Sequence, residues 1–260
     1  MESVRAGFCC ITNPYNSKQT TRVSLSPEDV DVIVFWTKNP EPMLKHLDEL
    51  ESRGFQFYFQ FTVNDYPLEL EPHVPSINDR LDTFKALSER IGSDRVIWRY
   101  DPIVISRLTP VEYHQKHFHK LSQALAGYTK RVIISLVDEY KQASKRLNRL
   151  DIGYVEATID TPGMTDLLLS ISKNARDAGM EIHSCAEPWN LSPYGISPGK
   201  CIDDTYIHTV FGIDVSLEKD KNQRTECGCV KSKDIGTYTT CRHNCQYCYA
   251  TRVLKLEVRS

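Results

Sequence analysis

The sequence has no long hydrophobic run, and no stretch approaches the roughly 20 apolar residues that are needed to span a bilayer. Its first residues, MESVRAGFCCITNPYN, contain no apolar segment followed by a small-residue cleavage site, so we expect no signal peptide and a cytoplasmic location. An excess of charge of one sign is also lacking, because 32 Lys and Arg residues stand against 34 Asp and Glu residues. The net charge of −2 gives no electrostatic reason to expect a membrane partner, and it disfavours nucleic acid.

Repeats and low-complexity linkers are absent too, so nothing in the sequence requires a second domain. One basic stretch, KQASKRLNRL (residues 141–150), could contact phosphates, but charged runs of this kind usually form the solvated face of a helix. We therefore expect a single domain in two parts. Residues 1–190 would form the body with an N-terminal hairpin, and residues 191–260 a cysteine-rich tail packed on it.

The sequence does have nine cysteines, an unusual number for a protein expected in a reducing compartment. Structural disulfides are rare there, so metal binding or catalysis becomes the better explanation. Cys9 and Cys10 lie in the apolar run GFCCI, where we expect them to behave as small buried hydrophobic residues. The other seven all fall in the last third of the chain: Cys185, Cys201, Cys227, Cys229, Cys241, Cys245 and Cys248.

Short apolar runs alternate with segments of helical periodicity, a pattern typical of βα units and a parallel sheet. After a hairpin around residues 13–16, we predict strands over residues 31–36, 55–62, 95–100, 131–137 and 180–185. Helices are predicted over residues 41–53, 77–91, 110–125, 139–150 and 164–178, with a short one over 203–211 in the tail. The predicted fold class is α/β, a partial or permuted TIM-type (β/α) barrel.

Each predicted strand is followed by at least one ionisable or amide side chain. In an α/β barrel the active site forms where the strands end and the βα loops begin. Unpaired charges directly after apolar strands are costly, so we interpret these residues as a binding site, with mutual salt bridges as the alternative. The residues that would hold the polar end of a cofactor or substrate are Thr37, Lys38, Asn39, Arg99, Asp101 and Glu187.

The segment TTCRHNCQYCYATR holds Cys241, Cys245 and Cys248 in a CxxxCxxC spacing. Zinc prefers four closed ligands, whereas three thiolates on one loop can hold three irons of a 4Fe-4S cluster and leave the fourth iron open. The segment resembles the cluster loop of the radical SAM superfamily, and CQYCYA is similar to the motif in spore photoproduct lyase and its relatives. The resemblance implies a barrel of the radical SAM kind, an open iron that binds S-adenosylmethionine, and a position for Tyr247 near the adenine.

That superfamily carries the cysteine loop after its first barrel strand, whereas here the loop follows the last predicted strand. The first and last strands of a barrel become neighbours when it closes, so we predict that residues 234–240 (DIGTYTT) form the preceding strand of a permuted barrel. Two elements of the related patterns are missing, a first strand ending in a Ser-Arg-Arg-Thr-Asp-like stretch and a Gly-Gly-Glu stretch that contacts the methionine amino group. The exit WTKNP would take over the second role.

The whole chain is also similar to an uncharacterised prokaryotic family whose members carry a radical-SAM-like cysteine cluster at the C-terminus. The matching stretches include RVSLSPEDVDVIVFWTKNP, RVIWRYDPI, GKCIDD and KDKNQRTECGCVKSKDIG. This resemblance covers nearly the entire chain, but it implies no reaction because none is established for the family.

The remaining cysteines of the last third suggest a second site. Brought together, four thiolates could hold a second iron–sulfur cluster or a zinc ion that pins the tail onto the barrel, with simple burial of two of them as the alternative. These residues are Cys185, Cys201, Cys227 and Cys229.

Three functional hypotheses follow from these patterns. The first is a radical SAM-type enzyme, in which a 4Fe-4S cluster cleaves S-adenosylmethionine and a small-molecule or other unknown substrate loses a hydrogen atom, with a flavodoxin or ferredoxin as electron donor. The second is a non-catalytic iron–sulfur or zinc protein whose barrel binds a ligand or partner. The third is DNA repair like that of photoproduct lyase, against which the near-neutral charge argues.

Overall fold

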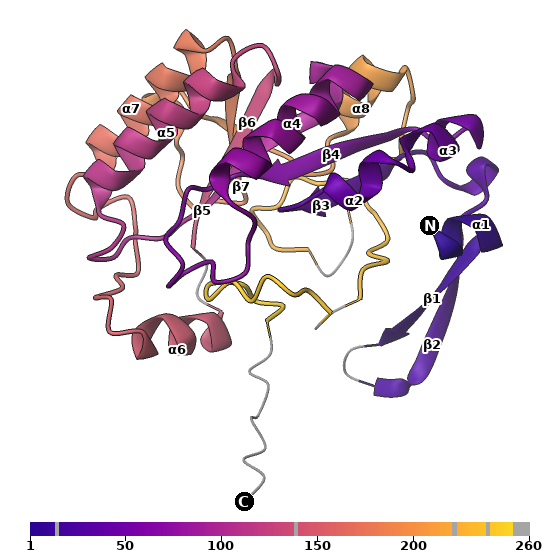
Figure 1. Ribbon diagram of the computed structural model, residues 1–260, viewed down its shortest axis with the longest axis horizontal. Helices are drawn as coiled ribbons and strands as arrows, with labels where there is room; N and C mark the ends of the chain where they lie inside the picture. Colours follow the sequence, from indigo (N-terminus) through magenta and orange to yellow (C-terminus); the bar gives the residue numbers. More distant parts are fainter. Residues whose placement is uncertain (14–15, 138–139, 220–222, 238–239, 252–260) are drawn as a thin grey trace, which may run out of the picture.

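The computed structural model describes residues 1–13, 16–137, 140–219, 223–237 and 240–251. A short helix, α1 (Glu2–Ala6), leads into an antiparallel hairpin of β1 (Phe8–Asn13) and β2 (Asn16–Ser24), which confirms the predicted hairpin. The hairpin extends from the right-hand side of the molecule in Figure 1. Cys9 is half-buried and Cys10 is exposed on this ribbon, so the predicted burial of Cys10 is wrong: alternate side chains of a two-stranded ribbon face solvent.

The main sheet is entirely parallel, and its six strands follow one another in chain order. Because every strand runs the same way, the carboxyl ends of all six lie along one edge of the sheet. Five of the strands match predicted ones, and β8 arises within the segment predicted as tail. The strands are β3 (Ile33–Thr37), β4 (Phe57–Thr62), β5 (Val96–Ile103), β6 (Arg131–Leu136), β7 (Glu181–Cys185) and β8 (Ser197–Gly199).

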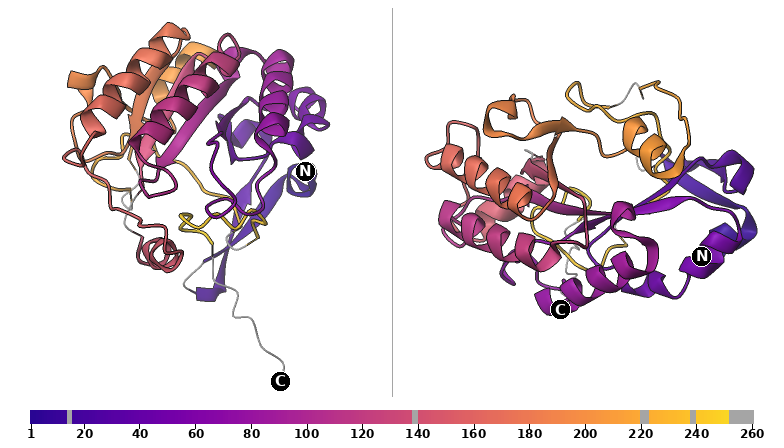
Figure 2. Two further views of the ribbon diagram at one scale, coloured as in Figure 1. Left: turned by 60° about the vertical axis from the view of Figure 1, so that its left-hand side comes forward. Right: turned by 90° about the horizontal axis from the view of Figure 1, so that it is seen from above.

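Helices cover both faces of this sheet. α4, α5 and α7 lie on one face, α8 lies on the opposite face, and α6 stands at the carboxyl edge beneath the strands (Figures 1 and 2). The helices are α2 (Glu41–Leu44), α3 (Leu47–Ser52), α4 (Ile77–Ile91), α5 (Val111–Leu125), α6 (Lys141–Arg149), α7 (Met164–Asp177) and α8 (Asp204–Phe211). Single 3-10 turns occur at Pro27–Asp29, Ser93–Arg95 and Ser192–Tyr194.

The alternation of side chains along β4 explains the two covered faces. Phe57, Phe59 and Phe61 are fully buried in the large core beneath the helices. Tyr58 points to the other face, where its ring packs edge-on against Tyr206 of α8 at 5.1 Å. A strand buried on both faces needs a nearly continuous apolar run, which FYFQF supplies with a single polar residue, Gln60.

The sheet is open, and the predicted closure of a permuted barrel is not observed. Within the described residues the edge strands β3 and β8 do not pair with each other. Residues 234–237 and 240 form no strand, while residues 238 and 239 of the predicted strand lie outside the described residues. The tail instead places α8 against the second face of the sheet, and α8 covers its apolar side chains without any need for closure.

The helix predicted over residues 41–53 is divided into α2 and α3. Lys45 and His46 form a turn between them. This turn allows Leu47 and Leu50, both fully buried, to face the core. The amphipathic pattern predicted the helical segments but not the break, because tertiary packing of these two leucines decides where the helix bends.

Candidate functional site

The cysteine loop lies at the carboxyl edge of the sheet, where the sequence predicted it. Cys241 is exposed, Cys245 is buried and Cys248 is half-buried. The loop is held by hydrogen bonds to main-chain carbonyls of the segment that follows β4. Gln246 donates its N–H to the carbonyl of Leu70 at 3.0 Å, and a ring nitrogen of His243 donates to the carbonyl of His73 at 3.0 Å.

Arg146 of α6 fixes the loop from the other side. Its guanidinium donates to the carbonyls of Gln246 at 3.0 Å and Thr251 at 2.9 Å, and also to the carbonyl of Cys248. The planar five-donor guanidinium can serve three diverging carbonyls at once, which a lysine cannot do. α6 therefore anchors the backbone around the last two cysteines.

Glu71 is the polar centre beneath this loop. Its side chain is 1% exposed and accepts hydrogen bonds from the Tyr247 hydroxyl and from Lys38 Nζ at 2.9 Å. Arg80 Nη1 lies 3.5 Å from the other carboxylate oxygen, and its buried Nε has no hydrogen-bond partner among the residues that the structure describes. Two cations facing one anion give this group a net charge of +1.

Tyr247 is enclosed by the protein. The residue is 6% exposed, and its ring packs edge-on against Tyr66 at 5.7 Å and has Lys38 Nζ 5.5 Å from its centroid. Burial raises the pKa of Tyr247 well above its usual value and the Glu71 carboxylate adds to the rise, so the phenol stays protonated and donates. The exposed aromatic ring of the loop is that of Tyr249, at 59% exposure.

The pKa of the Cys245 thiol is affected both by burial and by the charges of Lys38 and Glu71. Burial raises the pKa of Cys245 to about 12, Lys38 opposes the rise, and Glu71 adds to it. A thiol becomes a metal ligand only as the thiolate, so a metal must displace the proton. Lys38 is the residue that favours this step.

Of the predicted polar strand exits, Lys38 alone lies in this group. The Thr37 hydroxyl accepts the N–H of Asn39 at 3.0 Å, and the Asn39 side chain accepts the N–H of Glu41 at 3.2 Å, so both shape the turn into α2. The Glu187 carboxylate accepts the N–H of Leu136 at 2.8 Å. These three side chains thus have local structural contacts.

Arg99 and Asp101 form the salt bridge that was the alternative to a binding site. Arg99 Nε lies 2.9 Å from the Asp101 carboxylate, and Arg99 Nη1 contacts Gln60 Oε1 at 2.5 Å and Cys201 Sγ at 2.9 Å. Burial opposes the charge of Arg99, but Asp101 and the nearby thiols outweigh it and raise the pKa of Arg99. Arg99 therefore belongs with the second cysteine group, on the face that the tail covers.

Three cysteine thiols make up the donor set of the CxxxCxxC loop. Among the described residues, no three His, Cys, Asp or Glu side chains converge closely enough to hold one metal ion. In an iron–sulfur cluster each cysteine ligates a different iron, so its ligands need not meet at one point. The loop supplies three such thiols, the type of donor that a cluster uses, next to the Lys38–Glu71–Arg80 group.

Three residues of this site were missed by the sequence reasoning. Glu71 lies in the loop between β4 and α4, and Arg80 lies in the first turns of α4. Arg146 lies in the basic run interpreted from the sequence as a solvated helix face. Glu71 in LELEP carries no recognisable motif, so no sequence signal marked it. Arg146 could have been found by helical spacing, because it shares a face with the buried Ala143 and Leu147.

A cleft with a volume of about 420 Å³ opens beside the charged group. Arg80 and Asn39 contribute to its lining, and the other lining residues are Glu41, Pro75, Asp79, Asp82 and Thr83. A polar ligand could therefore approach the charged group through this cleft.

The fold and the site define an α/β protein with a sequentially ordered parallel sheet and a cysteine loop fixed at its carboxyl edge. The family model described as a domain of unknown function, DUF1848, matches residues 1–250, and the chain belongs to this family. The match includes all nine cysteines. No curated protein matches the chain. None of the helices in the described part of the chain is long and apolar enough to span a membrane.

Proposed function

We propose that the protein is a radical SAM-type iron–sulfur enzyme whose 4Fe-4S cluster is held by Cys241, Cys245 and Cys248. The observation that carries the proposal is the position of the loop. Three thiols of one loop lie at the carboxyl edge of a parallel sheet in sequential order, beside the buried Lys38–Glu71–Arg80 group. In this proposal the open sheet is a partial barrel of the radical SAM kind.

Such a cluster, when reduced, supplies the electron that cleaves S-adenosylmethionine into methionine and a hydrogen-abstracting 5′-deoxyadenosyl radical. The residues of this chain bind and position. Lys38 favours the Cys245 thiolate, Arg146 fixes the carbonyls around Cys248, and Tyr247 locks the loop onto Glu71. The ring of Tyr249, which lies 5.2 Å from that of Tyr140 and is more exposed than Tyr247, is the aromatic ring that an adenine would contact in this proposal.

The substrate in this proposal is a small polar molecule. Arg80 and Asn39 line the cleft beside the Lys38–Glu71–Arg80 group, together with the carboxylates of Glu41, Asp79 and Asp82, so the cleft offers polar groups of both kinds to a ligand. An amino-acid carboxylate of S-adenosylmethionine has the charge that the net +1 group favours.

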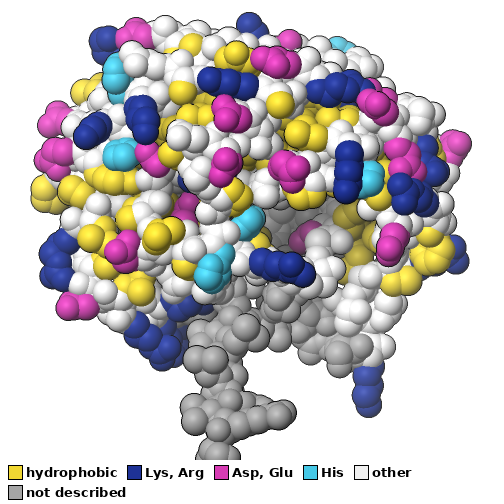
Figure 3. Space-filling model, viewed as in Figure 1, with side chains coloured by type: hydrophobic (Ala, Val, Ile, Leu, Met, Phe, Trp, Pro, Cys, Tyr) yellow, Lys and Arg dark blue, Asp and Glu magenta, His cyan; other side chains and the backbone are white. Residues whose placement is uncertain are grey.

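The electron donor is a small acidic protein such as a flavodoxin or ferredoxin. The exposed residues Lys141, Lys145 and Arg149 lie on α6, the helix that contacts the cysteine loop through Arg146. Dark blue side chains are grouped at the lower left of Figure 3, where α6 lies, whereas charges of both signs are mixed over the rest of that face. A basic helix next to the loop steers an acidic donor towards the cluster.

The test is anaerobic reconstitution with iron and sulfide, followed by metal analysis and electron paramagnetic resonance. We expect about four irons and four sulfides per chain and a reduced-cluster signal that changes when S-adenosylmethionine is added. Cys245→Ser should abolish the signal and Cys10→Ser should preserve it. A cluster that ignores S-adenosylmethionine would overturn the enzymatic proposal in favour of a non-catalytic iron–sulfur protein, and protein that takes up no iron would overturn both.

The donor surface has its own test. Replacement of Lys141, Lys145 and Arg149 by Glu should slow cluster reduction by a flavodoxin at least tenfold at low ionic strength. Reduction by dithionite, which needs no docking, should be unchanged. Equal effects on both reductants would refute a docking role for α6.

A further inference from the structure

A second group of thiols lies on the face of the sheet that the tail covers. Cys185 ends β7, and its Sγ lies 2.9 Å from Cys201 Sγ. Cys229 Sγ accepts the N–H groups of Cys201 at 3.1 Å and Ile202 at 3.3 Å, and its side chain interacts with both Cys201 and Cys227. The four cysteines that remain outside the CxxxCxxC loop and the hairpin are thus brought into one continuous group.

The surroundings of these sulfurs are those of metal-bound thiolates. Sulfur ligands of metals are typically stabilised by hydrogen bonds from N–H groups. Here Cys229 receives two backbone N–H donors and Cys201 receives the guanidinium of Arg99 at 2.9 Å. Neutral thiols are weak acceptors and do not need three such donors.

We propose that Cys185, Cys201, Cys227 and Cys229 form a tetrathiolate site for one Zn²⁺ ion that fastens the tail to the sheet. Zinc–sulfur bonds of about 2.3 Å in a tetrahedron place the sulfurs about 3.8 Å apart. In the structure the contacts of the four run in series, from Cys185 through Cys201 and Cys229 to Cys227, and no three of these described side chains meet at one point. For one ion to bind all four, Cys185 and Cys201 must separate by about 1 Å and the loop cysteines must close around a common point. A 4Fe-4S cluster would require Cys185 and Cys201 to separate much further.

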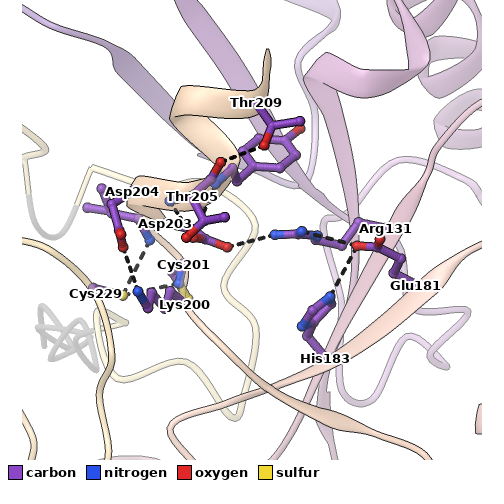
Figure 4. Close-up of polar contacts among 12 residues, drawn as sticks. Arg131, Glu181, His183, Lys200, Cys201, Asp203, Asp204, Thr205, Thr209 and Cys229 are labelled. Atoms are coloured by element: carbon purple, nitrogen blue, oxygen red, sulfur yellow. Dashed lines mark hydrogen bonds and ion pairs between the residues drawn. The ribbon is translucent and has the colours of Figure 1, made fainter. Parts of the chain in front are cut away.

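The chain can make this adjustment. Cys185 is fixed on β7, whereas Cys201, Cys227 and Cys229 lie outside helices and strands. Figure 4 shows Cys201 and Cys229 next to one another, with Lys200 paired to Asp204 on one side and Arg131 paired to Asp203 on the other. These ion pairs hold α8 and the start of the tail, so the ion would join three separate segments: β7, the loop before α8 and the segment around 227–229.

The site is tested in the full-length chain with Cys241, Cys245 and Cys248 all replaced by Ser, which cannot assemble the cluster of the proposed function. Co²⁺ added anaerobically to the reduced protein should bind with about one equivalent per chain. The spectrum should show the strong ligand-field bands of tetrahedral Co²⁺ and sulfur-to-cobalt charge-transfer intensity for four thiolates. Zn²⁺ should displace the Co²⁺. Bands for two or fewer thiolates, or no bands, would overturn the proposal.

A second measurement uses the same variant, in which all four cysteines of the proposed zinc site are retained. Alkylation of the same protein with and without Zn²⁺ is mapped residue by residue with mass spectrometry. Zn²⁺ should slow the modification of Cys185, Cys201, Cys227 and Cys229 at least tenfold, while exposed Cys10 reacts at the same rate. Uniform protection, or incorporation of iron and sulfide in place of Zn²⁺, would refute a zinc site. Because this variant lacks the cluster cysteines, neither result depends on the radical SAM proposal.

Discussion

The hydroxyl of Tyr247 donates a hydrogen bond to the buried carboxylate of Glu71, a residue 176 positions earlier in the chain. Glu71 also pairs with Lys38 and Arg80, so this one carboxylate connects the cysteine loop with the exit of β3 and with α4. The contact explains why the loop is well packed although it contains no helix or strand.

Replacement of Glu71 by Gln should destabilise the protein strongly. The substitution leaves Lys38 and Arg80 facing no anion in a buried position, and breaking such a group costs about 3 kcal/mol or more in the free energy of unfolding. Denaturant titration measures this loss. Glu69→Gln is the matched control, because Glu69 is exposed two residues away and should change stability by no more than about 0.5 kcal/mol. Similar small effects of both variants would contradict the role of Glu71.

Tyr247→Phe should have a smaller effect that depends on Glu71. The loss of one hydrogen bond to a charged acceptor costs about 1.5–3 kcal/mol. In the background of Glu71→Gln the same substitution should cost clearly less, and a double-mutant cycle on unfolding free energies measures the difference. Additive effects would show that the two side chains do not act together. Tyr128→Phe, on a partly buried ring at the main core, serves as the comparison.

Arg146→Lys should loosen the cysteine loop without unfolding the domain. The lysine ammonium cannot reach three diverging carbonyls, so the carbonyls of Gln246, Cys248 and Thr251 lose part of their support. We expect alkylation of Cys248 to become about tenfold faster, which corresponds to about 1.4 kcal/mol of lost local stability. Arg149→Lys, on the exposed side of the same helix, should leave the rate unchanged. Equal rates in both variants would argue against anchoring by α6.

Buried His114 should make the protein less stable in mild acid. Its Nε2–H donates to the Val104 carbonyl at 3.0 Å, so Nδ1 accepts from the Tyr100 hydroxyl at 2.9 Å and the ring is neutral. Burial lowers the pKa of His114 from 6.5 to about 4. The unfolded chain therefore binds the proton first as the pH falls, and stability decreases from about pH 6.5 down to about pH 4, by about 3 kcal/mol in total.

The His114 effect is measured as the free energy of unfolding against pH. His114→Gln should be less stable near neutral pH but should lose this part of the acid dependence. His119→Gln, at an exposed position on the same helix, should retain the slope. An unchanged slope in His114→Gln would show that other groups cause the acid sensitivity.

Gly199→Ala should weaken the attachment of β8 to the sheet. A Cβ at this position would lie 2.7 Å from the backbone oxygen of Ser184 and 2.8 Å from His183 Cβ, so the two strands would have to separate. The expected cost is about 1–3 kcal/mol in unfolding free energy. At exposed Gly236 the nearest atom to a Cβ is a carboxylate oxygen of Asp234, which can rotate away, and Gly236→Ala should be nearly neutral. A neutral Gly199→Ala would mean that β8 pairs more loosely than its register indicates.

Most of the secondary structure could be predicted because it depends on local patterns. The run FQFYFQFT and the helical periodicity of residues 77–91 are each sufficient to mark a buried strand and an amphipathic helix, and both were confirmed. β8 was missed because its three residues, Ser-Pro-Gly, have no strand propensity and pair with β7 only through tertiary contact. The break between α2 and α3 was missed for a similar reason, since burial of Leu47 and Leu50 decides it.

The sequence by itself determined the alternation of strands and helices of a parallel α/β fold and the CxxxCxxC spacing of the loop, because periodicity and close spacing depend on neighbouring residues. Only the tertiary structure decided that the sheet stays open, since the apolar second face of the sheet is covered by α8. It also decided which charges meet: Arg99 pairs with Asp101 and contacts Cys201, while Lys38 pairs with Glu71. The sequence does not show which charged residue will pair with which, because packing brings together segments that lie far apart in the chain.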